Sequence, residues 1–223
     1  MGLDWPGFGI RLTGYVWLPM RARLYLTFQQ IGADLFAAGL ASATSGNYSA
    51  RERDGFWITR SGVQKAHLTP EDLIFLPLEP DPLRDQGASV ERVIHRAIYR
   101  QTDATAVVHA HPRHAIALSF HLQVIEPIDL EGRYYFEHIP VVAPATLSGT
   151  QEAAEAVAQA LQENPACVVR GHGAFVKSSL EVPEQALLQA YSLMTSLEEA
   201  CEVLFLERLW RGFSGDGLGE ASE

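Results

Sequence analysis

The amino-acid sequence predicts a single-domain α/β sandwich. Segments with helical periodicity alternate along the chain with short apolar runs typical of strands, and this alternation is characteristic of layered α/β proteins. No internal repeat or linker divides the chain, and its 223 residues are enough for one sizeable hydrophobic core. With 47% hydrophobic and 20% charged residues, the composition is that of an ordinary globular protein.

The first predicted elements are a helix and a hairpin. Apolar residues recur every three or four positions from Leu24 to Leu35, which predicts a helix over residues 20–40 with Gly39 as its C-terminal stop. A loop of small polar residues follows. Asp54-Gly55 then lies between two strand-like runs, as is typical of a tight hairpin turn. The expected strands cover residues 47–52, 56–60 and 73–78.

The second half of the chain continues the alternation. Apolar positions at helical spacing predict a helix over residues 89–100, and an Ala/Glu/Gln-rich run predicts another over residues 150–163. Pro183 suits the first turn of a last helix. Residues 122–149 are expected to be mostly irregular. The remaining expected elements are strands over residues 106–111, 139–142, 166–170 and 174–176, a helix over residues 113–121, and the last helix over residues 183–210.

The sequence is expected to divide into three parts. Met20 opens the first periodic segment, so residues 1–19 are expected to be an extension that is not native or is poorly ordered. Residues 20–212 form the predicted domain. Residues 213–223 form an acidic tail, rich in Gly and Ser, that we expect to be mobile.

Charge and cysteine content bound the class of protein. The formal net charge of −10 argues against non-specific binding to nucleic acid or to an anionic membrane surface. No stretch approaches the roughly 18 apolar residues of a membrane-spanning helix, and the N-terminus does not resemble a signal peptide. Cys167 and Cys201 lie in apolar runs, which indicates buried free thiols in a reducing compartment. We therefore expect a cytoplasmic protein with neither nucleic-acid nor membrane partners.

Three of the eight histidines form a pattern that suits a metal ion. His109 and His111 are separated by one alanine, and side chains two apart on a strand point to the same face. His172, flanked on both sides by glycine, follows an apolar strand and could supply a third nitrogen. Three imidazoles with one open position are the layout of a catalytic zinc site. Ordinary structural histidines are the alternative, and these residues alone leave both interpretations open.

Glu91 is a candidate acid or base. We expect it in the first turn of the helix over residues 89–100, where the helix dipole favours a carboxylate. A surface glutamate at a helix start is equally consistent with this position. His95, four residues later, could share the same face of the helix.

Two loops are suited to an anion. Ser-Gly-Asn at residues 45–47 follows the first helix, and Thr-Arg-Ser-Gly at residues 59–62 follows a strand. Small residues with hydroxyls and free backbone N–H groups can hold a phosphate, although each loop could also be a plain turn. Neither loop matches a P-loop, and no G-x-G-x-x-G opens a helix, so a dinucleotide site is not expected.

Taken in order, these motifs resemble the class II aldolase/adducin family. The resemblance covers roughly residues 22–207, and the order of the motifs is far more specific than any one of them. The matching stretches are SGNYSAR (45–51), ITRSG (58–62), SVERVIH (89–95), AVVHAHP (106–112) and GHGAF (171–175). Within the family the likeness is closest to aldolases of L-fuculose 1-phosphate, including the run PIDLEG at residues 127–132.

The resemblance implies an α/β/α fold around a largely antiparallel or mixed sheet, and a homotetramer with active sites at subunit interfaces. It also implies a divalent metal, zinc with cobalt or manganese as alternatives, on His109, His111 and His172. Glu91 would be the acid and base, and a metal ligand when no substrate is bound. The substrate phosphate would be held by Gly46, Asn47, Ser61, Gly62 and Ser89.

The implied reaction belongs to carbohydrate metabolism. A zinc-dependent aldehyde-lyase would cleave a ketose 1-phosphate, L-fuculose 1-phosphate or similar, to dihydroxyacetone phosphate and a small aldehyde such as L-lactaldehyde. Breaking the C3–C4 bond leaves a negative charge beside a carbonyl, and a metal ion can stabilise the resulting enediolate as a Lewis acid. Glu91 would exchange the C3 proton of dihydroxyacetone phosphate.

Two departures from the family pattern affect this expectation. The aldolases carry two serines before the glutamate, where this chain has Ser89 and Val90, so one phosphate hydroxyl is lost. Their interface tyrosine would fall near Leu130. The proton donor to the leaving aldehyde is therefore left unassigned, with Tyr134 and Tyr135 as candidates.

Other members of the family offer alternatives. Pentulose-phosphate 4-epimerases usually have Asp at the position of Glu91 and His-Thr-His-Ser at the metal motif, so this chain favours an aldolase. Methylthioribulose-1-phosphate dehydratases keep the glutamate and are harder to exclude. The adducin head keeps the fold as a non-catalytic structural module without a full metal site, whereas all four candidate residues are present here.

Overall fold

The computed structural model describes residues 20–146 and 149–214. The expected extension, residues 1–19, lies outside the described residues, and so do residues 215–223 of the expected tail. Phe213 and Ser214, the first two residues assigned to that tail, are instead the last residues of the C-terminal helix.

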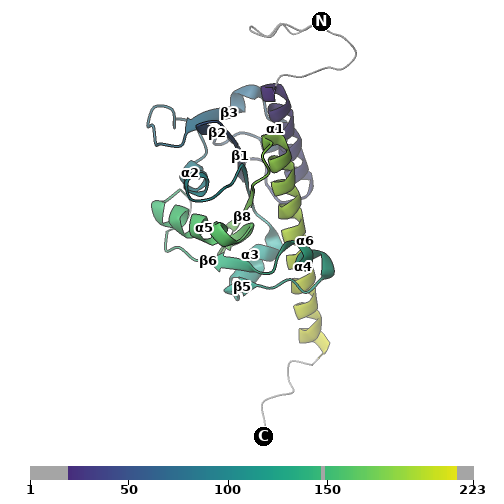
Figure 1. Ribbon diagram of the computed structural model, residues 1–223. Helices are drawn as coiled ribbons and strands as arrows, with labels where there is room; N and C mark the ends of the chain where they lie inside the picture. Colours follow the sequence, from purple (N-terminus) through teal and green to yellow (C-terminus); the bar gives the residue numbers. More distant parts are fainter. Residues whose placement is uncertain (1–19, 147–148, 215–223) are drawn as a thin grey trace, which may run out of the picture.

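One mostly antiparallel sheet forms the middle layer of the molecule (Figure 1). Its strands are β1 (Asn47–Glu52), β2 (Gly55–Thr59), β3 (Leu73–Pro77), β4 (Ala106–Ala110), β5 (Val124–Ile125), β6 (Ile139–Val142), β7 (Ala166–Val169) and β8 (Gly173–Ser178). They lie in the order β3-β2-β1-β4-β8-β7-β6-β5, and among the described strands only β6 and β7 pair in parallel.

Helices cover both faces of this sheet. The helices are α1 (Met20–Ala37), α2 (Arg92–Gln101), α3 (Arg113–Ser119), α4 (Leu130–Tyr135), α5 (Gln151–Glu163) and α6 (Pro183–Ser214). Helices α1, α3 and α6 share one hydrophobic core with the sheet, α4 packs on α6, and α2 and α5 pack together over the opposite face. The predicted α/β/α sandwich is therefore confirmed.

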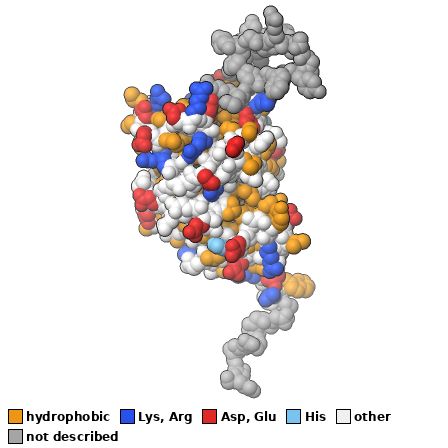
Figure 2. Space-filling model, in the orientation of Figure 1, with side chains coloured by type: hydrophobic (Ala, Val, Ile, Leu, Met, Phe, Trp, Pro, Cys, Tyr) orange, Lys and Arg blue, Asp and Glu red, His pale blue; other side chains and the backbone are white. Residues whose placement is uncertain are grey.

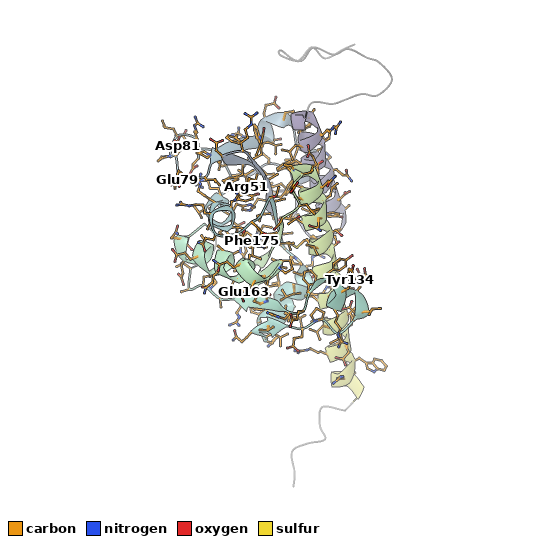
Figure 3. All side chains as sticks on the ribbon, viewed as in Figure 1. Arg51, Glu79, Asp81, Tyr134, Glu163 and Phe175 are labelled. Atoms are coloured by element: carbon orange, nitrogen blue, oxygen red, sulfur yellow. The ribbon has the colours of Figure 1, made fainter. Side chains whose placement is uncertain are left out.

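Strand β4 divides its side chains between the two cores. Val108 and Ala110 face the core beneath α1 and α6, whereas Val107 faces the core beneath α2 and α5. His109 shares the face of Val107, and its ring stacks on Phe175 with 4.2 Å between ring centroids. Figure 3 shows Phe175 in the middle of the molecule. Because His109 packs on this ring, the alternation of side chains along β4 places His109 deep between the sheet and α2.

The structure differs from the expected elements at the start of α2, in residues 122–149, and in residues 65–72, which hold two short 3-10 helices, Lys65–His67 and Pro70–Asp72. The helix expected from residue 89 begins at Arg92, because Ser89, Val90 and Glu91 form a turn in which the Ser89 hydroxyl accepts the Glu91 N–H. The segment expected to be irregular also holds β5 and α4. Helix α4 is capped by Asp129, whose carboxylate accepts the Gly132 N–H.

Two further expectations concern helices and thiols. Among the residues that the structure describes, no helix has both the length and the apolar character needed to cross a membrane. Cys167 and Cys201 are buried free thiols, as predicted.

Candidate metal centre and active site

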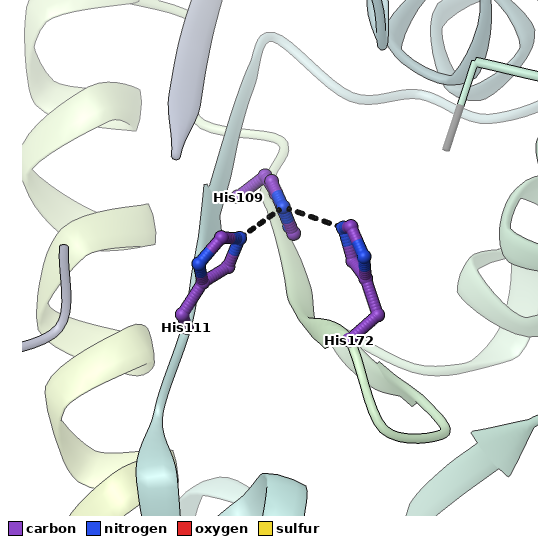
Figure 4. Close-up of side chains that lie close together, drawn as sticks. All are labelled: His109, His111 and His172. Atoms are coloured by element: carbon purple, nitrogen blue, oxygen red, sulfur yellow. Dashed lines mark hydrogen bonds between the residues drawn. The ribbon is translucent and has the colours of Figure 1, made fainter. Parts of the chain in front are cut away.

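Three histidine side chains converge at one end of the central strands (Figure 4). His109 lies on β4, His111 lies one residue beyond its end, and His172 lies in the turn between β7 and β8. One possible ligand atom from each residue lies within 4.8 Å of the other two. Nε2 of His109 is 3.1 Å from Nε2 of His111 and 3.2 Å from Nε2 of His172. The structure thus brings together the strand pair and the turn histidine that the sequence pattern singled out.

The glycines on either side of the turn histidine make this approach possible. A Cβ atom at Gly173 would lie 2.4 Å from the carbonyl oxygen of Ala110, 2.8 Å from Cδ2 of His111 and 2.9 Å from Cε1 of His109. A side chain at this position would therefore collide with both the strand and the histidines. Gly171 has a φ of +69°, in the left-handed region that favours glycine.

His109 presents an unprotonated nitrogen to the cluster. Its Nδ1 is 2.9 Å from the carbonyl oxygen of Ala174, and a carbonyl oxygen only accepts, so Nδ1 carries the hydrogen. Burial lowers the pKa of His109 to about 4 and also lowers the pKa of His111, so both imidazoles are neutral at pH 7. The single lone pair on Nε2 of His109 then faces two more imidazole nitrogens and a carboxylate oxygen. A divalent cation shared among these groups fits this donor set.

The Glu91 carboxylate closes a further side of the cluster. Its Oε1 is 3.0 Å from Nε2 of His172, and its Oε2 is 3.1 Å from Nε2 of His109. Glu91 is only 5% exposed, which excludes the alternative of a surface glutamate at a helix start. It is the N-cap residue of α2 but makes no capping hydrogen bond, because its carboxylate is directed at the histidines and at Asn47.

The surroundings of Glu91 favour its ionised form. Burial raises the pKa of this carboxyl, but the charge that His109 carries when it is protonated, together with the hydrogen bonds from His172 and Asn47, outweighs burial and lowers the pKa below its usual value. Since His109 is neutral at pH 7, the hydrogen bonds and any cation bound beside them keep the carboxylate charged. Glu91 therefore has the charge state of a base at neutral pH.

A polar cleft of about 190 Å³ opens beside the histidines. The loops after α1 and β2 and the turn before α2 form its walls. All five residues expected to hold a phosphate line it, together with two of the histidines: Gly46, Asn47, Ser61, Gly62, Ser89, His111 and His172. A second hollow, of about 290 Å³, lies at the opposite end of β8 beyond α5 and has no histidine in its wall.

Two of the expected phosphate residues have their side chains engaged inside the site. Nδ2 of Asn47 donates to Oε2 of Glu91 at 2.6 Å, and its Oδ1 lies 2.6 Å from Nε2 of His95. The hydroxyl of Ser89 accepts the Glu91 N–H at 3.3 Å. A contact between Asn47 and a phosphate would therefore come from the backbone of Asn47.

Lys65 is a cation in the cleft that the sequence motifs did not single out. It is 2% exposed, and its Nζ donates to the carbonyl oxygens of Thr44 and Val63, each at 3.1 Å. The ammonium group therefore joins the two loops that form the cleft. Burial lowers the pKa of Lys65 to about 8, so the group is charged at neutral pH. The available signal was its place three residues after Gly62, the last residue of a loop expected to bind an anion; in the structure Lys65 opens a short 3-10 helix, Lys65–His67.

The tyrosines considered as proton donors lie away from the cleft of this chain. Tyr134 is 81% exposed on α4 (Figure 3), and Tyr135 packs against the hydrophobic core. Neither lines the cleft, and Leu130 is also exposed on α4. The group that exchanges a proton with the aldehyde oxygen therefore stays unassigned.

A comparison with known protein families shows to which family the chain belongs. The family described as class II aldolase and adducin N-terminal domain matches residues 27–205. The chain belongs to this family. The resemblance drawn from the five ordered motifs is thus confirmed, and the match spans every residue of the histidine cluster and the polar cleft.

Individual members of the class II aldolase family are similar over most of the chain. The crystal structure of l-fuculose-1-phosphate aldolase from Thermus thermophilus is 60% identical, covers 86% of this chain and 97% of that chain, and has a TM-score of 0.83. The 5-methylthioribulose-1-phosphate/5-deoxyribulose-1-phosphate aldolase of Escherichia coli is 31% identical over 142 residues, which are 63% of this chain and 66% of that protein. A probable methylthioribulose-1-phosphate dehydratase of Drosophila pseudoobscura pseudoobscura is 26% identical over 182 residues, 71% of this chain and 79% of that protein.

Proposed function

We propose that the protein is a metal-dependent aldolase. It cleaves a ketose 1-phosphate, L-fuculose 1-phosphate or a similar sugar, to dihydroxyacetone phosphate and a small aldehyde, L-lactaldehyde in the case of fuculose. The observation that carries this proposal is the convergence of three imidazole nitrogens and a buried carboxylate beside a polar cleft. The 60% identity with an l-fuculose-1-phosphate aldolase supports the choice of substrate.

The loop cleft is proposed to bind the substrate phosphate. The hydroxyls and backbone N–H groups of its wall can donate to phosphate oxygens, and Lys65 adds a positive charge at the base of both loops. This local field, and not the net charge of −10, decides whether an anion binds. The proposed phosphate residues are Gly46, Asn47, Ser61, Gly62 and Ser89. Binding the phosphate away from the reacting carbons fixes the pose of the sugar.

The histidine cluster is proposed to hold the divalent ion. His109, His111 and His172 are its ligands, and Glu91 completes the coordination when no substrate is bound. A set of three imidazoles suits zinc, with cobalt or manganese as alternatives. When bound, such an ion supplies Lewis-acid stabilisation of the negative charge that develops on the substrate oxygens.

Glu91 is proposed as the group that moves the proton at C3. In the condensation direction it removes a proton from C3 of dihydroxyacetone phosphate. In the cleavage direction the C4 hydroxyl loses its proton as the C3–C4 bond breaks and the aldehyde forms, and Glu91, in its protonated form, delivers one proton to C3, so that the two proton transfers balance. Its ionised carboxylate suits removal of the proton, and its burial keeps water from competing with the substrate carbon. The hydrogen bond from Asn47 holds the carboxylate beside the histidines.

The experiment that tests this function is product identification from a panel of phosphorylated sugars. The protein is incubated with L-fuculose 1-phosphate, ribulose 1-phosphate, 5-deoxyribulose 1-phosphate, methylthioribulose 1-phosphate and ribulose 5-phosphate, with and without a chelator. We expect dihydroxyacetone phosphate from at least one ketose 1-phosphate, and its loss on chelation. Conversion of ribulose 5-phosphate to its 4-epimer alone, or no reaction with any sugar, would contradict an aldolase.

A methylthioribulose-1-phosphate dehydratase is the second candidate function, because a curated relative that matches 71% of this chain carries that name. Both reactions develop negative charge at C3 beside the C2 carbonyl. They diverge at C4, where an aldolase breaks the C3–C4 bond and a dehydratase expels the C4 hydroxyl as water. The same panel separates them, since loss of water from methylthioribulose 1-phosphate without dihydroxyacetone phosphate would identify a dehydratase.

The proposed assembly is a cytoplasmic homotetramer with active sites at its interfaces. Figure 2 shows hydrophobic side chains gathered over α4 and the C-terminal part of α6, and a second copy of the chain would remove them from water. The most exposed of these side chains are Leu130, Tyr134, Trp210 and Phe213. The buried free thiols suit the reducing cytoplasm. Sedimentation should give four times the chain mass of 24.6 kDa, and a monomer in solution would contradict this assembly.

A further inference from the structure

Helix α2 buries a histidine that the proposed reaction does not use. His95 is fully buried, one turn beyond Glu91, and its ring lies edge-on to Phe175 with 6.0 Å between ring centroids. Both ring nitrogens are hydrogen-bonded, Nδ1 to the hydroxyl of Ser49 and Nε2 to Oδ1 of Asn47, each at 2.6 Å. A buried polar ring is costly unless its nitrogens are paired, so these two partners fix its position.

His95 belongs to a row of polar side chains that come from strand β1 and from helix α2 and its N-cap, and the spacing of the strand residues matches that of the helix residues. Asn47 and Ser49 lie two residues apart on β1. The N-cap residue Glu91 and two residues of α2, His95 and Tyr99, follow one another at intervals of four. Two strand residues rise about 6.6 Å and four helix residues rise about 6.0 Å, so the two sets stay in step along the sheet. The row ends where the hydroxyl of Ser49 lies 2.7 Å from the hydroxyl of Tyr99.

The hydrogen bonds of this row have one consistent direction. Nδ2 of Asn47 donates to the Glu91 carboxylate, which leaves Oδ1 facing His95. A carbonyl oxygen only accepts, so Nε2 of His95 carries the hydrogen and Nδ1 of the neutral ring accepts from Ser49. The Ser49 hydroxyl then accepts from Tyr99. Burial lowers the pKa of His95 to about 3, which agrees with a neutral ring.

We propose that His95 is a positioning residue for Glu91 and acts through the side-chain amide of Asn47. By donating from Nε2, His95 holds the oxygen of that amide and keeps its NH2 group directed at the carboxylate. This inference rests on the proposed function, since proton transfer by Glu91 at C3 is the step that benefits. Without the Nε2 donor the amide oxygen loses its partner, and the Asn47 side chain is held only by its own hydrogen bond to the carboxylate, so neither group is fixed in place.

The first test compares three variants of the metal-loaded protein. His95→Leu removes the donor, His95→Gln places an amide N–H where Nε2 was, and Ile98→Ala is a matched control. Ile98 is fully buried on the same helix, belongs to the hydrophobic core beneath α2 and α5, and makes no side-chain hydrogen bond. The assay is exchange of the C3 proton of dihydroxyacetone phosphate with deuterium, followed by proton NMR at several substrate concentrations.

The expected result separates positioning from loss of stability. His95→Leu should lower the maximal exchange rate about 10- to 100-fold with a KM for dihydroxyacetone phosphate within about twofold of wild type, and His95→Gln should recover most of the rate. Ile98→Ala should lower Tm but leave the exchange rate unchanged. A His95→Leu rate equal to that of Ile98→Ala, or a His95→Gln rate as low as that of His95→Leu, would overturn the proposal.

A second measurement needs neither activity nor metal. In metal-free wild type with 15N-labelled histidine rings, His95 is assigned as the resonance pair that disappears in His95→Gln. The proposal expects a protonated Nε2 and an unprotonated, hydrogen-bonded Nδ1, and a proton on Nδ1 would overturn it. If wild type shows no C3 exchange, the proposed function fails, while the ring resonances still decide the direction of the row.

Discussion

Replacing Gly173 by alanine tests how closely the strands must approach to bring the histidines together. The added Cβ would lie 2.4 Å from the carbonyl oxygen of Ala110, where real Cβ contacts essentially never fall below 3.0 Å. Extending this contact from 2.4 to 3.0 Å requires a displacement of about 0.6 Å between β4 and β8. The same Cβ would lie 2.9 Å or less from ring carbons of His109 and His111, so the rings must move as well.

This displacement should weaken metal binding more than folding. Changes that misplace metal ligands typically cost 10- to 100-fold in affinity, which is about 1.4 to 2.8 kcal/mol. The assay is competition for zinc with a chromophoric chelator, together with Tm of the metal-free protein. Gly212→Ala is the matched control, because a Cβ at Gly212 meets nothing within 4 Å. A zinc affinity of Gly173→Ala equal to that of wild type would refute the need for this close approach of β8 to the histidines.

Four further variants test individual residues. His172→Ala should lose bound metal and dihydroxyacetone phosphate release together, as measured by elemental analysis and a coupled assay, whereas full activity of metal-depleted wild type would exclude the metal mechanism. Glu91→Gln should retain metal but slow C3 proton exchange about 10²- to 10⁴-fold by proton NMR, and unchanged exchange would remove Glu91 from the mechanism. Because the pKa of Lys65 is about 8, its charge is lost as pH rises through 8. Calorimetry should therefore show that the affinity of wild type for sulfate falls above that pH. Lys65→Met should bind sulfate about tenfold more weakly than wild type below pH 8, and its affinity should change little with pH. A parallel decline in both proteins would exclude Lys65 as the group that binds the anion. Val90→Ser adds a hydroxyl to the cleft and should lower KM for a ketose 1-phosphate about threefold, and an unchanged KM would place the phosphate elsewhere.

The alternation of elements was predictable because its signals are local. The periodicity of α1, the Asp54-Gly55 turn and the two-residue alternation of β4 each need only a few neighbouring residues to be recognised. The same local rules placed His109 and His111 on one side of a strand. Their convergence with His172 followed from the ordered family motifs and not from periodicity.

Short elements and turns set by side chains were not predictable in this way. Strand β5 has two residues and α4 has six, which is too short for a hydrophobic period to be visible. Helix α4 depends on the Asp129 cap. The late start of α2 likewise depends on the Ser89 hydroxyl and on a Glu91 side chain drawn away from the helix end.

The roles of Asn47 and Lys65 depend on contacts between distant parts of the chain. Asn47 lies 44 residues from Glu91 in sequence, and its loop motif suggested a phosphate contact, whereas the fold uses its side chain to orient the carboxylate. Lys65 gains its role only when the loops of Thr44 and Val63 meet around its ammonium group. The contact between Asn47 and Glu91 has no signature in local sequence, and for Lys65 the local signal was only its place three residues after Gly62.

The proposed active centre is tested most directly by C3 proton exchange of dihydroxyacetone phosphate in deuterated water, because this assay needs no knowledge of the aldehyde. Metal-loaded wild type should exchange one C3 proton, chelation should abolish the exchange, and added zinc should restore it. Exchange that persists in metal-free protein, or its absence from fully loaded protein, would contradict an active centre built from the three histidines and Glu91.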